Sequence, residues 1–249
     1  MISNNDIKRI KALQQKKFRD ETGLFLVEGE KMVDELLKSG WNVESIYRRD
    51  DIGEDAMKRI SALANPSPIL ATVHKPDDAY IDEASQLEGL LDEGGLFLAL
   101  DTIRDPGNLG TILRIADWFG IKAVLAAKDT VDVFNPKVVQ ATMGAIFRVK
   151  MHYVDLPELS SIILSRGGHI FGTFLDGENM YAKDLDNGKD SPSMIVIGNE
   201  SVGISSQMAS LVTDRLYIPP FPAACVRPKA SRPTVSTPAS GRTPPKIGR

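Results

Sequence analysis

The chain has 249 residues, of which 42% are hydrophobic and 25% charged, and its formal net charge is −3 at pH 7. Such values are ordinary for a globular protein and predict one large or two modest domains. The apolar runs, such as those at residues 96–100 and 194–197, are far shorter than the roughly 20 residues of a membrane span, so we expect no membrane segment. A polar start and a single cysteine, Cys225, argue against a signal peptide and an internal disulfide and favour the cytoplasm.

The first 92 residues are expected to form a small αβ domain. Met32, Val33, Leu36 and Leu37 are expected to share one helix face. The acidic, turn-rich stretch at 75–95 ends in two glycines, where we place a domain boundary. In chain order the segment reads as a helix at 6–18, a strand at 24–27, a helix ended by Gly40, a strand at 43–47 and a helix at 57–64 ended by Pro66.

Basic side chains gather near the start of the chain although the total charge is negative. Phosphate contacts need local positive charge and not a basic total, so this segment is a candidate RNA contact. Taken alone, the pattern favours a solvated helix face. The basic residues are Lys8, Arg9, Lys11, Lys16, Lys17 and Arg19, set against the single acid Asp6.

Residues 95–221 alternate short apolar runs with helical periods. This pattern predicts a mostly parallel sheet with helices on both faces, and ligands in such sheets bind at the carboxyl ends of the strands. The expected strands are 96–100, 123–126, 170–175, 194–197 and 216–218, and the expected helices are 108–119, 136–143, 157–166 and 205–212.

Three common α/β chemistries lack their motifs in this sequence. It contains no G-x-G-x-x-G after a strand, no G-x-x-x-x-G-K-[ST] loop and no G-x-S-x-G elbow. The histidines His74, His152 and His169 are isolated from one another and from Cys225, so we expect no metal site.

A strand, a Pro-Gly turn and a helix follow one another over residues 100–119. Asn108 is a suitable helix N-cap, and Arg114 is expected to point away from the buried stripe, together with Trp118. A second segment, 198–204, follows a strand directly and places Glu200 between two glycines. Singly, these features are typical of a helix cap, a surface arginine and a strand-to-helix loop.

Two further segments also lie where a strand or a helix is expected to end. Residues 172–177 form a strand that ends in a turn, and at 135–148 a helix is expected to begin after Asn135, to stop at Gly144 and to lead into a strand. Each segment taken singly is typical of an ordinary turn or helix cap.

Together and in this order, the four segments resemble the SpoU/TrmH branch of the SPOUT methyltransferases. Asn108 and Arg114 resemble the first motif of that family, and residues 197–204 resemble the second. Asn135-Pro136-Lys137 and residues 144–148 also match it closely, so that the resemblance covers about residues 96–221. Residues 25–29 give the first part a looser similarity to the small ribosomal-protein-like RNA-binding domain that often precedes this catalytic domain.

The resemblance implies an S-adenosyl-L-methionine-dependent methyltransferase that acts on a ribose 2′-hydroxyl of RNA. The RNA is ribosomal by family analogy, with transfer RNA left open. It also implies a C-terminal trefoil-type knot, a homodimer and no metal. Catalytic residues would be Arg114, Asn108 and Glu200. The cofactor pocket would be lined by Thr173, Leu175, Gly177, Gly198, Glu200, Gly203 and Ile218, and RNA would contact Lys8, Arg9, Lys16, Lys17 and Arg19.

Each catalytic residue can be given a role on chemical grounds. Arginine is hard to deprotonate, so Arg114 is expected to clamp a phosphate and to stabilise developing alkoxide charge. Asn108 would fix the active-site loop or the hydroxyl, and Glu200 would orient Arg114.

The end of the chain departs from the family pattern. Where the family has a Ser-Leu-Asn run opening a long apolar helix, residues 222–249 hold six prolines, six Lys or Arg residues and no acid, so we expect an atypical tail without a continuous helix. This departure leaves open a catalytically impaired RNA-binding paralogue. A SPOUT enzyme that methylates a base and a generic metabolite-binding α/β protein are further alternatives.

Overall fold

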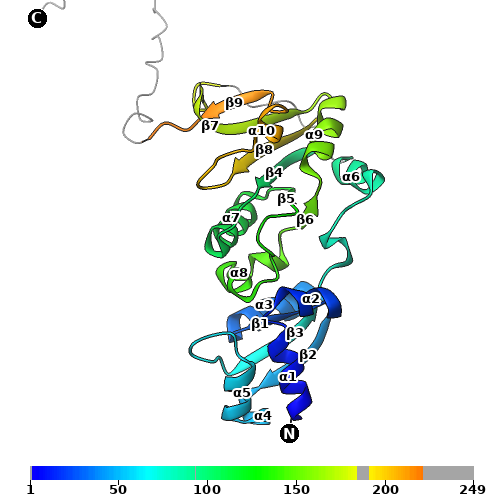
Figure 1. Cartoon of the computed structure of the whole chain (residues 1–249), viewed down its shortest axis with the longest axis vertical. Helices are drawn as coiled ribbons and strands as arrows, with labels where there is room; N and C mark the ends of the chain where they lie inside the picture. Colours follow the sequence, from blue (N-terminus) through cyan, green and yellow to red (C-terminus); the bar gives the residue numbers. More distant parts are fainter. Residues whose placement is uncertain (1, 93, 184–190, 221–249) are drawn as a thin grey trace, which may run out of the picture. The chain divides into compact units, whose positions relative to one another are not determined.

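The computed structural model describes residues 2–92, 94–183 and 191–220, shown in colour in Figure 1. Its contacts group Met1–Ile218 into one compact unit, and Pro219–Arg249 into another. Nearly all of the second unit, including the tail for which we expect no helix, lies outside the described residues. Where the chain is described, no helix combines the length and the apolar character needed to cross a membrane.

The N-terminal part is a three-stranded antiparallel sheet with helices packed against it. The strand order is β1-β3-β2, and β3 (Ile69–His74) was not predicted. The helix expected at 6–18 is broken into two. The remaining elements are α1 (Asn4–Ala12), α2 (Lys16–Thr22), β1 (Leu24–Glu28), α3 (Glu30–Ser39), β2 (Val43–Arg48), α4 (Arg49–Ile52) and α5 (Glu54–Ile60).

The following part contains a six-stranded sheet with the order β6-β5-β4-β8-β7-β9, in which every strand pair is parallel. The prediction of a mostly parallel sheet is confirmed, although the edge strand β6 (Met151–Val154) was missed. The other strands are β4 (Gly95–Asp101), β5 (Ala123–Ala127), β7 (His169–Asn179), β8 (Pro192–Gly198) and β9 (Asp214–Tyr217).

Helices cover both faces of this sheet. Successive strand side chains point to opposite faces, so Leu98 and Leu100 pack with α7 and α8 while Phe97 and Ala99 pack with α6, α9 and α10. The first of these cores continues into the N-terminal sheet through Phe25. The helices are η1 (Asp77–Ala79), α6 (Ala84–Leu91), α7 (Pro106–Phe119), α8 (Pro136–Ala141), η2 (Ala145–Phe147), α9 (Leu156–Ser165) and α10 (Ser206–Ala209).

Two local predictions were wrong. The N-cap of α7 is Asp105, whose carboxylate accepts the Asn108 backbone N–H at 2.7 Å, so Asn108 lies inside the first turn with its side chain free for another partner. After Gly144 the chain forms the short 3₁₀ helix η2 instead of a strand, and the strand begins only at Met151.

Candidate active site at the strand ends

A cavity of 630 Å³ opens at the carboxyl ends of β8 and β9, beside residues 173–175 in the middle of β7, and we call it the strand-end cavity. Its size lies within the range of about 300–1,000 Å³ that is usual for small-molecule sites. The position matches the rule that open parallel sheets bind ligands beyond their carboxyl edge. The cavity is lined by Thr173, Phe174, Leu175, Ile197, Gly198, Asn199, Glu200, Ser201, Val202, Gly203, Ile204, Tyr217 and Ile218.

Six of the seven residues predicted to line a cofactor pocket lie around this cavity, and only Gly177 does not. A Cβ at Gly177 would lie 2.5 Å from the Leu216 carbonyl carbon, so this glycine allows close passage of two backbones instead of lining the cavity. Leu175 is 95% exposed at the cavity wall, and Val202 and Ile218 are also exposed, so the described residues leave apolar lining open to solvent.

Residues 198–205, which we call the 198–205 loop, are tied to the end of β4. The Asn199 side chain donates to the Thr102 carbonyl at 2.8 Å, and the Ser205 backbone N–H donates to the Asp101 carboxylate at 2.6 Å. Thr102 has a φ of 66°, a left-handed conformation that is costly for a branched residue. Sequence reasoning gave none of these residues a role, and the only signal was the position of Asn199 inside the second motif.

Two of the predicted catalytic residues meet at this loop. Asn108, in the first turn of α7, donates from Nδ2 to Glu200 Oε1 at 2.7 Å, across 92 positions of sequence. A hydrogen bond to a charged acceptor is stronger than one between neutral groups. The pair therefore fixes the start of α7 against the 198–205 loop.

Arg114 lies apart from that pair. It is exposed, and it makes no hydrogen bond or ion pair with any residue that the structure describes. Six positions along an α-helix correspond to about 9 Å of rise and about 120° of rotation relative to Asn108. The expectation that Glu200 orients Arg114 is therefore not supported, because the partner of Glu200 is Asn108.

Arg114 lines a second cavity, of 390 Å³, which we call the α7 cavity. Large apolar side chains are exposed around it, and Trp118 has 84% of its surface accessible. The cavity is lined by Thr111, Arg114, Ile115, Asp117, Trp118, Phe119, Thr142, Met143 and Arg148.

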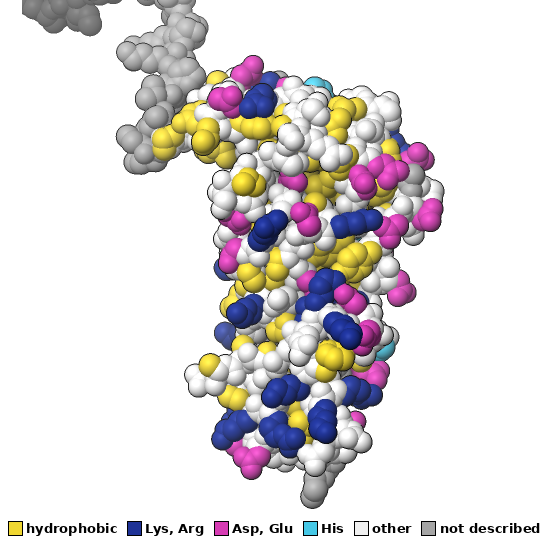
Figure 2. Space-filling view, in the orientation of Figure 1, with side chains coloured by type: hydrophobic (Ala, Val, Ile, Leu, Met, Phe, Trp, Pro, Cys, Tyr) yellow, Lys and Arg dark blue, Asp and Glu magenta, His cyan; other side chains and the backbone are white. Residues whose placement is uncertain are grey.

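The predicted RNA-contacting residues divide into two groups. Lys8, Arg9, Lys16 and Lys17 are exposed on α1 and α2, over which dark blue Lys and Arg side chains gather in Figure 2. Arg19 is only 1% exposed and is paired with Asp132, so the prediction that it contacts RNA is wrong. Lys16 and Lys17 also pair with Asp20 and Glu21, but exposed ion pairs of this kind are weak and leave the lysines available.

Across the part of the chain that the structure describes, no group of three or more His, Cys, Asp or Glu side chains is placed to hold a metal ion. The absence of a metal from the reaction stays a prediction.

A parallel sheet with helices on both faces and a ligand-sized cavity at its carboxyl edge defines an α/β protein with a candidate small-molecule site. Residues 95–224 match the SpoU rRNA Methylase family, and residues 4–71 match the MRM3-like substrate binding domain. The chain belongs to the SpoU rRNA methylase family, and the predicted SpoU/TrmH-type identity is confirmed.

Individual relatives agree with this assignment. The chain is 28% identical to the 23S rRNA (guanosine(2553)-2′-O)-methyltransferase RlmP of Bacillus subtilis, covering 87% of this chain and 88% of that protein. It is 32% identical to the mitochondrial rRNA methyltransferase 3 of Xenopus tropicalis, covering 83% of this chain but only 55% of that protein. The AdoMet-bound rRNA methyltransferase of Sinorhizobium meliloti superimposes with a TM-score of 0.75 at 29% identity, covering 88% of this chain and 87% of that one.

Proposed function

We propose that this chain transfers a methyl group from S-adenosylmethionine (AdoMet) to a ribose 2′-hydroxyl of ribosomal RNA. The class of enzyme, an AdoMet-dependent RNA methyltransferase, follows from membership of the family. The observation that carries the finer proposal is the Asn108–Glu200 contact beside the strand-end cavity, because it brings the first and second motifs to one edge of the sheet. RNA is the proposed partner, and transfer RNA and the cytoplasmic location stay open expectations.

The residues around the strand-end cavity fit AdoMet. Leu175, Val202 and Ile218 offer exposed apolar surface that can cover a purine ring. Glu200 adds a carboxylate to the cavity lining, which would favour the positive charge of a sulfonium, and residues of the 198–205 loop form much of the remaining lining. When bound, the cofactor supplies a methyl group already activated by positive charge.

The transfer forms a carbon–oxygen bond to the ribose and breaks the methyl carbon–sulfur bond, whose electron pair stays on sulfur in the departing neutral thioether, while the hydroxyl proton of the ribose passes to water. Because the hydroxyl is a weak acid, the residues of the chain must favour developing charge on its oxygen. Arg114 is proposed to hold the phosphate beside the target ribose and to stabilise that charge. Asn108, held by Glu200, is proposed to keep the 198–205 loop and the start of α7 in the productive arrangement.

The N-terminal part is the proposed RNA-binding domain. The family matches at residues 4–71 and 95–224 support a division into a substrate-binding domain over 1–92 and a methyltransferase domain over 95–221. The exposed cations on α1 and α2 are placed to neutralise phosphates. The names of the relatives support ribosomal RNA as the substrate class, although the chain spans little more than half of the mitochondrial proteins.

A homodimer would reconcile the two separated parts of the site. Ile115, Trp118, Phe119 and Met143 expose apolar surface around Arg114, and such patches are typical of protein interfaces. For the two parts to act together, a second copy seated on this face has to bring its own Arg114 to the strand-end cavity. We therefore propose that each active site draws Asn108 and Glu200 from one copy and Arg114 from its partner.

The knot implied by the family remains part of this proposal. Its supporting observation is the tight passage of β9 against the end of β7, where Gly177 lies against the backbone of Arg215 and Leu216. Close backbone packing of this kind is a requirement for threading one segment through another. The residues that would complete the knot follow Pro220 and lie outside the described residues.

The proposal is tested by titrating the chain with AdoMet in a calorimeter and then supplying labelled AdoMet together with ribosomal RNA. We expect saturable cofactor binding and label in the RNA. RNA binding without cofactor binding would instead support the non-catalytic paralogue, which the atypical residues at 222–249 favour. Binding of AdoMet alone, without RNA affinity or salt dependence, would support a metabolite-binding protein.

A further inference from the structure

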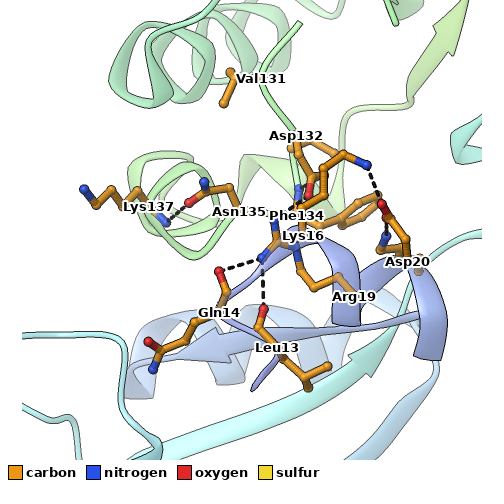
Figure 3. Close-up of polar contacts among 12 residues, drawn as sticks. Leu13, Gln14, Lys16, Arg19, Asp20, Val131, Asp132, Phe134, Asn135 and Lys137 are labelled. Atoms are coloured by element: carbon orange, nitrogen blue, oxygen red, sulfur yellow. Dashed lines mark hydrogen bonds and ion pairs between the residues drawn. The ribbon is translucent and has the colours of Figure 1, made fainter. Parts of the chain in front are cut away.

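All three guanidinium nitrogens of Arg19 donate hydrogen bonds to groups of the protein. Its Nε and Nη2 donate to Asp132 Oδ2 at 3.0 and 2.7 Å, and Nη1 donates to the carbonyls of Leu13 and Gln14, each at 2.9 Å. Figure 3 shows the guanidinium between these carbonyls and the Asp132 carboxylate. The Arg19 and Asp132 side chains are 2% and 5% exposed.

Asp132 belongs to a segment, residues 129–135, that precedes α8 in the methyltransferase part. Its second carboxylate oxygen accepts the Phe134 N–H at 3.0 Å. The Tyr153 hydroxyl donates to the Val131 carbonyl and accepts the Val133 N–H, both at 2.7 Å. The 129–135 segment is therefore held from two sides, by Tyr153 within the methyltransferase part and by Arg19 from the N-terminal part.

The same segment touches the backbone that holds the 198–205 loop. The Val131 N–H donates to the Ile103 carbonyl at 2.8 Å, and the Thr102 hydroxyl contacts the Asp129 carboxylate at 3.1 Å. The Thr102 carbonyl in turn accepts the Asn199 side chain. Hydrogen bonds joined by short stretches of backbone, from Asp132 to Val131 and from Ile103 to Thr102, thus lead from α2 to the strand-end cavity.

The cations proposed to contact RNA lie on the helices that Arg19 ties down. Lys16 and Lys17 precede Arg19 on α2, and the carbonyls of Leu13 and Gln14 follow the end of α1. A buried ion pair of this kind contributes little net stability compared with apolar packing, but its fixed donor geometry can specify one arrangement of the groups around it.

We propose that Arg19 is a positioning residue that holds the RNA-contacting helices α1 and α2 at a fixed position relative to the strand-end cavity. RNA bound to the N-terminal part then presents its ribose at a fixed distance from the methyl donor. The inference rests on the proposed function, because this relative position matters only if RNA bound to the N-terminal part reacts at the methyltransferase part. Arg19 itself touches neither substrate nor cofactor.

The test compares Arg19→Met, which keeps much of the aliphatic chain, with Arg19→Lys and with Arg59→Met. Arg59 is an exposed arginine of the same part whose guanidinium, among the residues that the structure describes, bonds only the Asn4 side chain, so its variant is the matched control. Hydrogen exchange of the 129–135 segment and the 198–205 loop is measured without RNA. AdoMet affinity, RNA affinity, kcat and KM are measured on the folded fraction.

For Arg19→Met we expect exchange in both segments to rise at least about tenfold, since a local restraint is lost. Affinities for AdoMet and RNA should stay within about threefold, because their contacts remain, while kcat falls by about ten- to a hundredfold, since small misplacements are costly in catalysis. Arg59→Met should match the parent chain in every measurement.

Two results would overturn the inference. The first is unchanged exchange at the 198–205 loop in Arg19→Met, and the second is a parent-like kcat despite increased exchange. If Arg19→Met does not fold, Arg19→Lys, which keeps the charge but loses the planar fork, must show the same pattern to a smaller degree. If the parent chain methylates no RNA, the proposed function fails, and the exchange measurement still decides whether Arg19 couples the two parts.

Discussion

Two polar side chains on α7 have opposite surroundings. Asn108 is engaged by Glu200, whereas Arg114 is exposed and has no ionic partner among the residues that the structure describes. An arginine without an internal partner keeps its full fork of donors for a ligand, and a phosphate is the geometric match for that fork. Arg114 is therefore the residue whose removal should affect the reaction without affecting the fold.

Arg114→Ala is predicted to lower the rate of RNA methylation by about 10²–10³-fold, as is typical when a donor to developing negative charge is removed. Affinity for AdoMet should change little, because Arg114 does not line the strand-end cavity. The measurements are single-turnover methylation and calorimetry. Arg166→Ala is the control, since Arg166 pairs with Asp92 away from both cavities. A variant that methylates at the parent rate would remove Arg114 from the mechanism.

The Asp214 carboxyl makes the stability of the fold depend on pH in the acid range. Burial alone would raise the pKa of its carboxyl, but hydrogen bonds from Lys183, Thr213 and His169 outweigh burial and lower the pKa to about 2. A carboxyl whose pKa is lower in the folded state than its ordinary value of 3.8 stabilises the fold above that value. This contribution is lost as the pH falls towards 2.

Asp214→Asn should therefore be less stable than the parent chain at neutral pH, and the difference should shrink between about pH 4 and pH 2. Urea unfolding at several pH values measures this directly. A difference in stability that is the same at pH 6 and at pH 2 would show that the charge of Asp214 is not its cause.

Arg19 and Asn108 show where residue-level prediction fails. A run of basic residues is typical of a solvated or RNA-binding face, and no local pattern separates Arg19 from its neighbours, because its partner Asp132 lies 113 positions later. Asn108 was predicted as a helix cap because its type is suitable, but Asp105 occupies that position. A tertiary contact decides the role of Arg19, whereas local capping by Asp105 leaves the Asn108 side chain free for its distant partner Glu200.

At the scale of elements, the shape of the 198–205 loop depends on the close approach of the Gly198 and Gly203 backbones. A Cβ at Gly198 would lie 2.2 Å from the Gly203 carbonyl carbon, so any side chain at this position must displace the backbone of the loop. The loop lines the strand-end cavity, and its shape therefore governs the proposed cofactor site.

Gly198→Ala is predicted to weaken AdoMet binding at least about tenfold while leaving most of the fold intact, because packed backbone atoms tolerate little overlap. Calorimetric titration gives the affinity, and circular dichroism gives the fold. Gly89→Ala is the control, since a Cβ at this helical position meets nothing within 4 Å and alanine favours a helix. Unchanged affinity in Gly198→Ala would exclude the loop from the cofactor site.

The sequence predicted most of the regular elements of the sheet but not β3 and β6. β3 is buried along nearly its whole length, so its residues show no alternation of polar and apolar types. β6 has only four residues and includes the buried polar residue His152. The strands that were predicted coincide with apolar runs bounded by turns, whereas β3, in the middle of its sheet, and β6, at an edge, lack a local pattern that separates them from the neighbouring chain.

At the scale of the whole molecule, the separation of Arg114 from the strand-end cavity is explained by the proposed dimer. Trp118→Glu would place a charge in the exposed apolar patch on α7, and burying an unpaired charge in an interface is costly. We predict a shift from dimer to monomer in sedimentation. Ile46→Glu, on the exposed side of β2, is the control and should remain dimeric. A parent chain that is monomeric would contradict the dimer proposal.

Mixing two inactive variants tests whether the site is shared. Asn108→Ala and Arg114→Ala, unfolded and refolded together, should recover about a quarter of the parent activity, because half of randomly paired dimers are mixed and each of these has one complete site. No recovery in dimers that are shown to be mixed would place Arg114 and Asn108 of the same copy in one site.

The transfer of a methyl group to a ribose oxygen is tested most directly by the chemical identity of the product. RNA incubated with the chain and isotopically labelled AdoMet is digested to nucleosides and analysed by mass spectrometry. We predict that the label is found on the sugar of a 2′-O-methylated nucleoside, and that it disappears with Arg114→Ala. Label on a base, or no label in RNA although AdoMet is bound, would contradict this function.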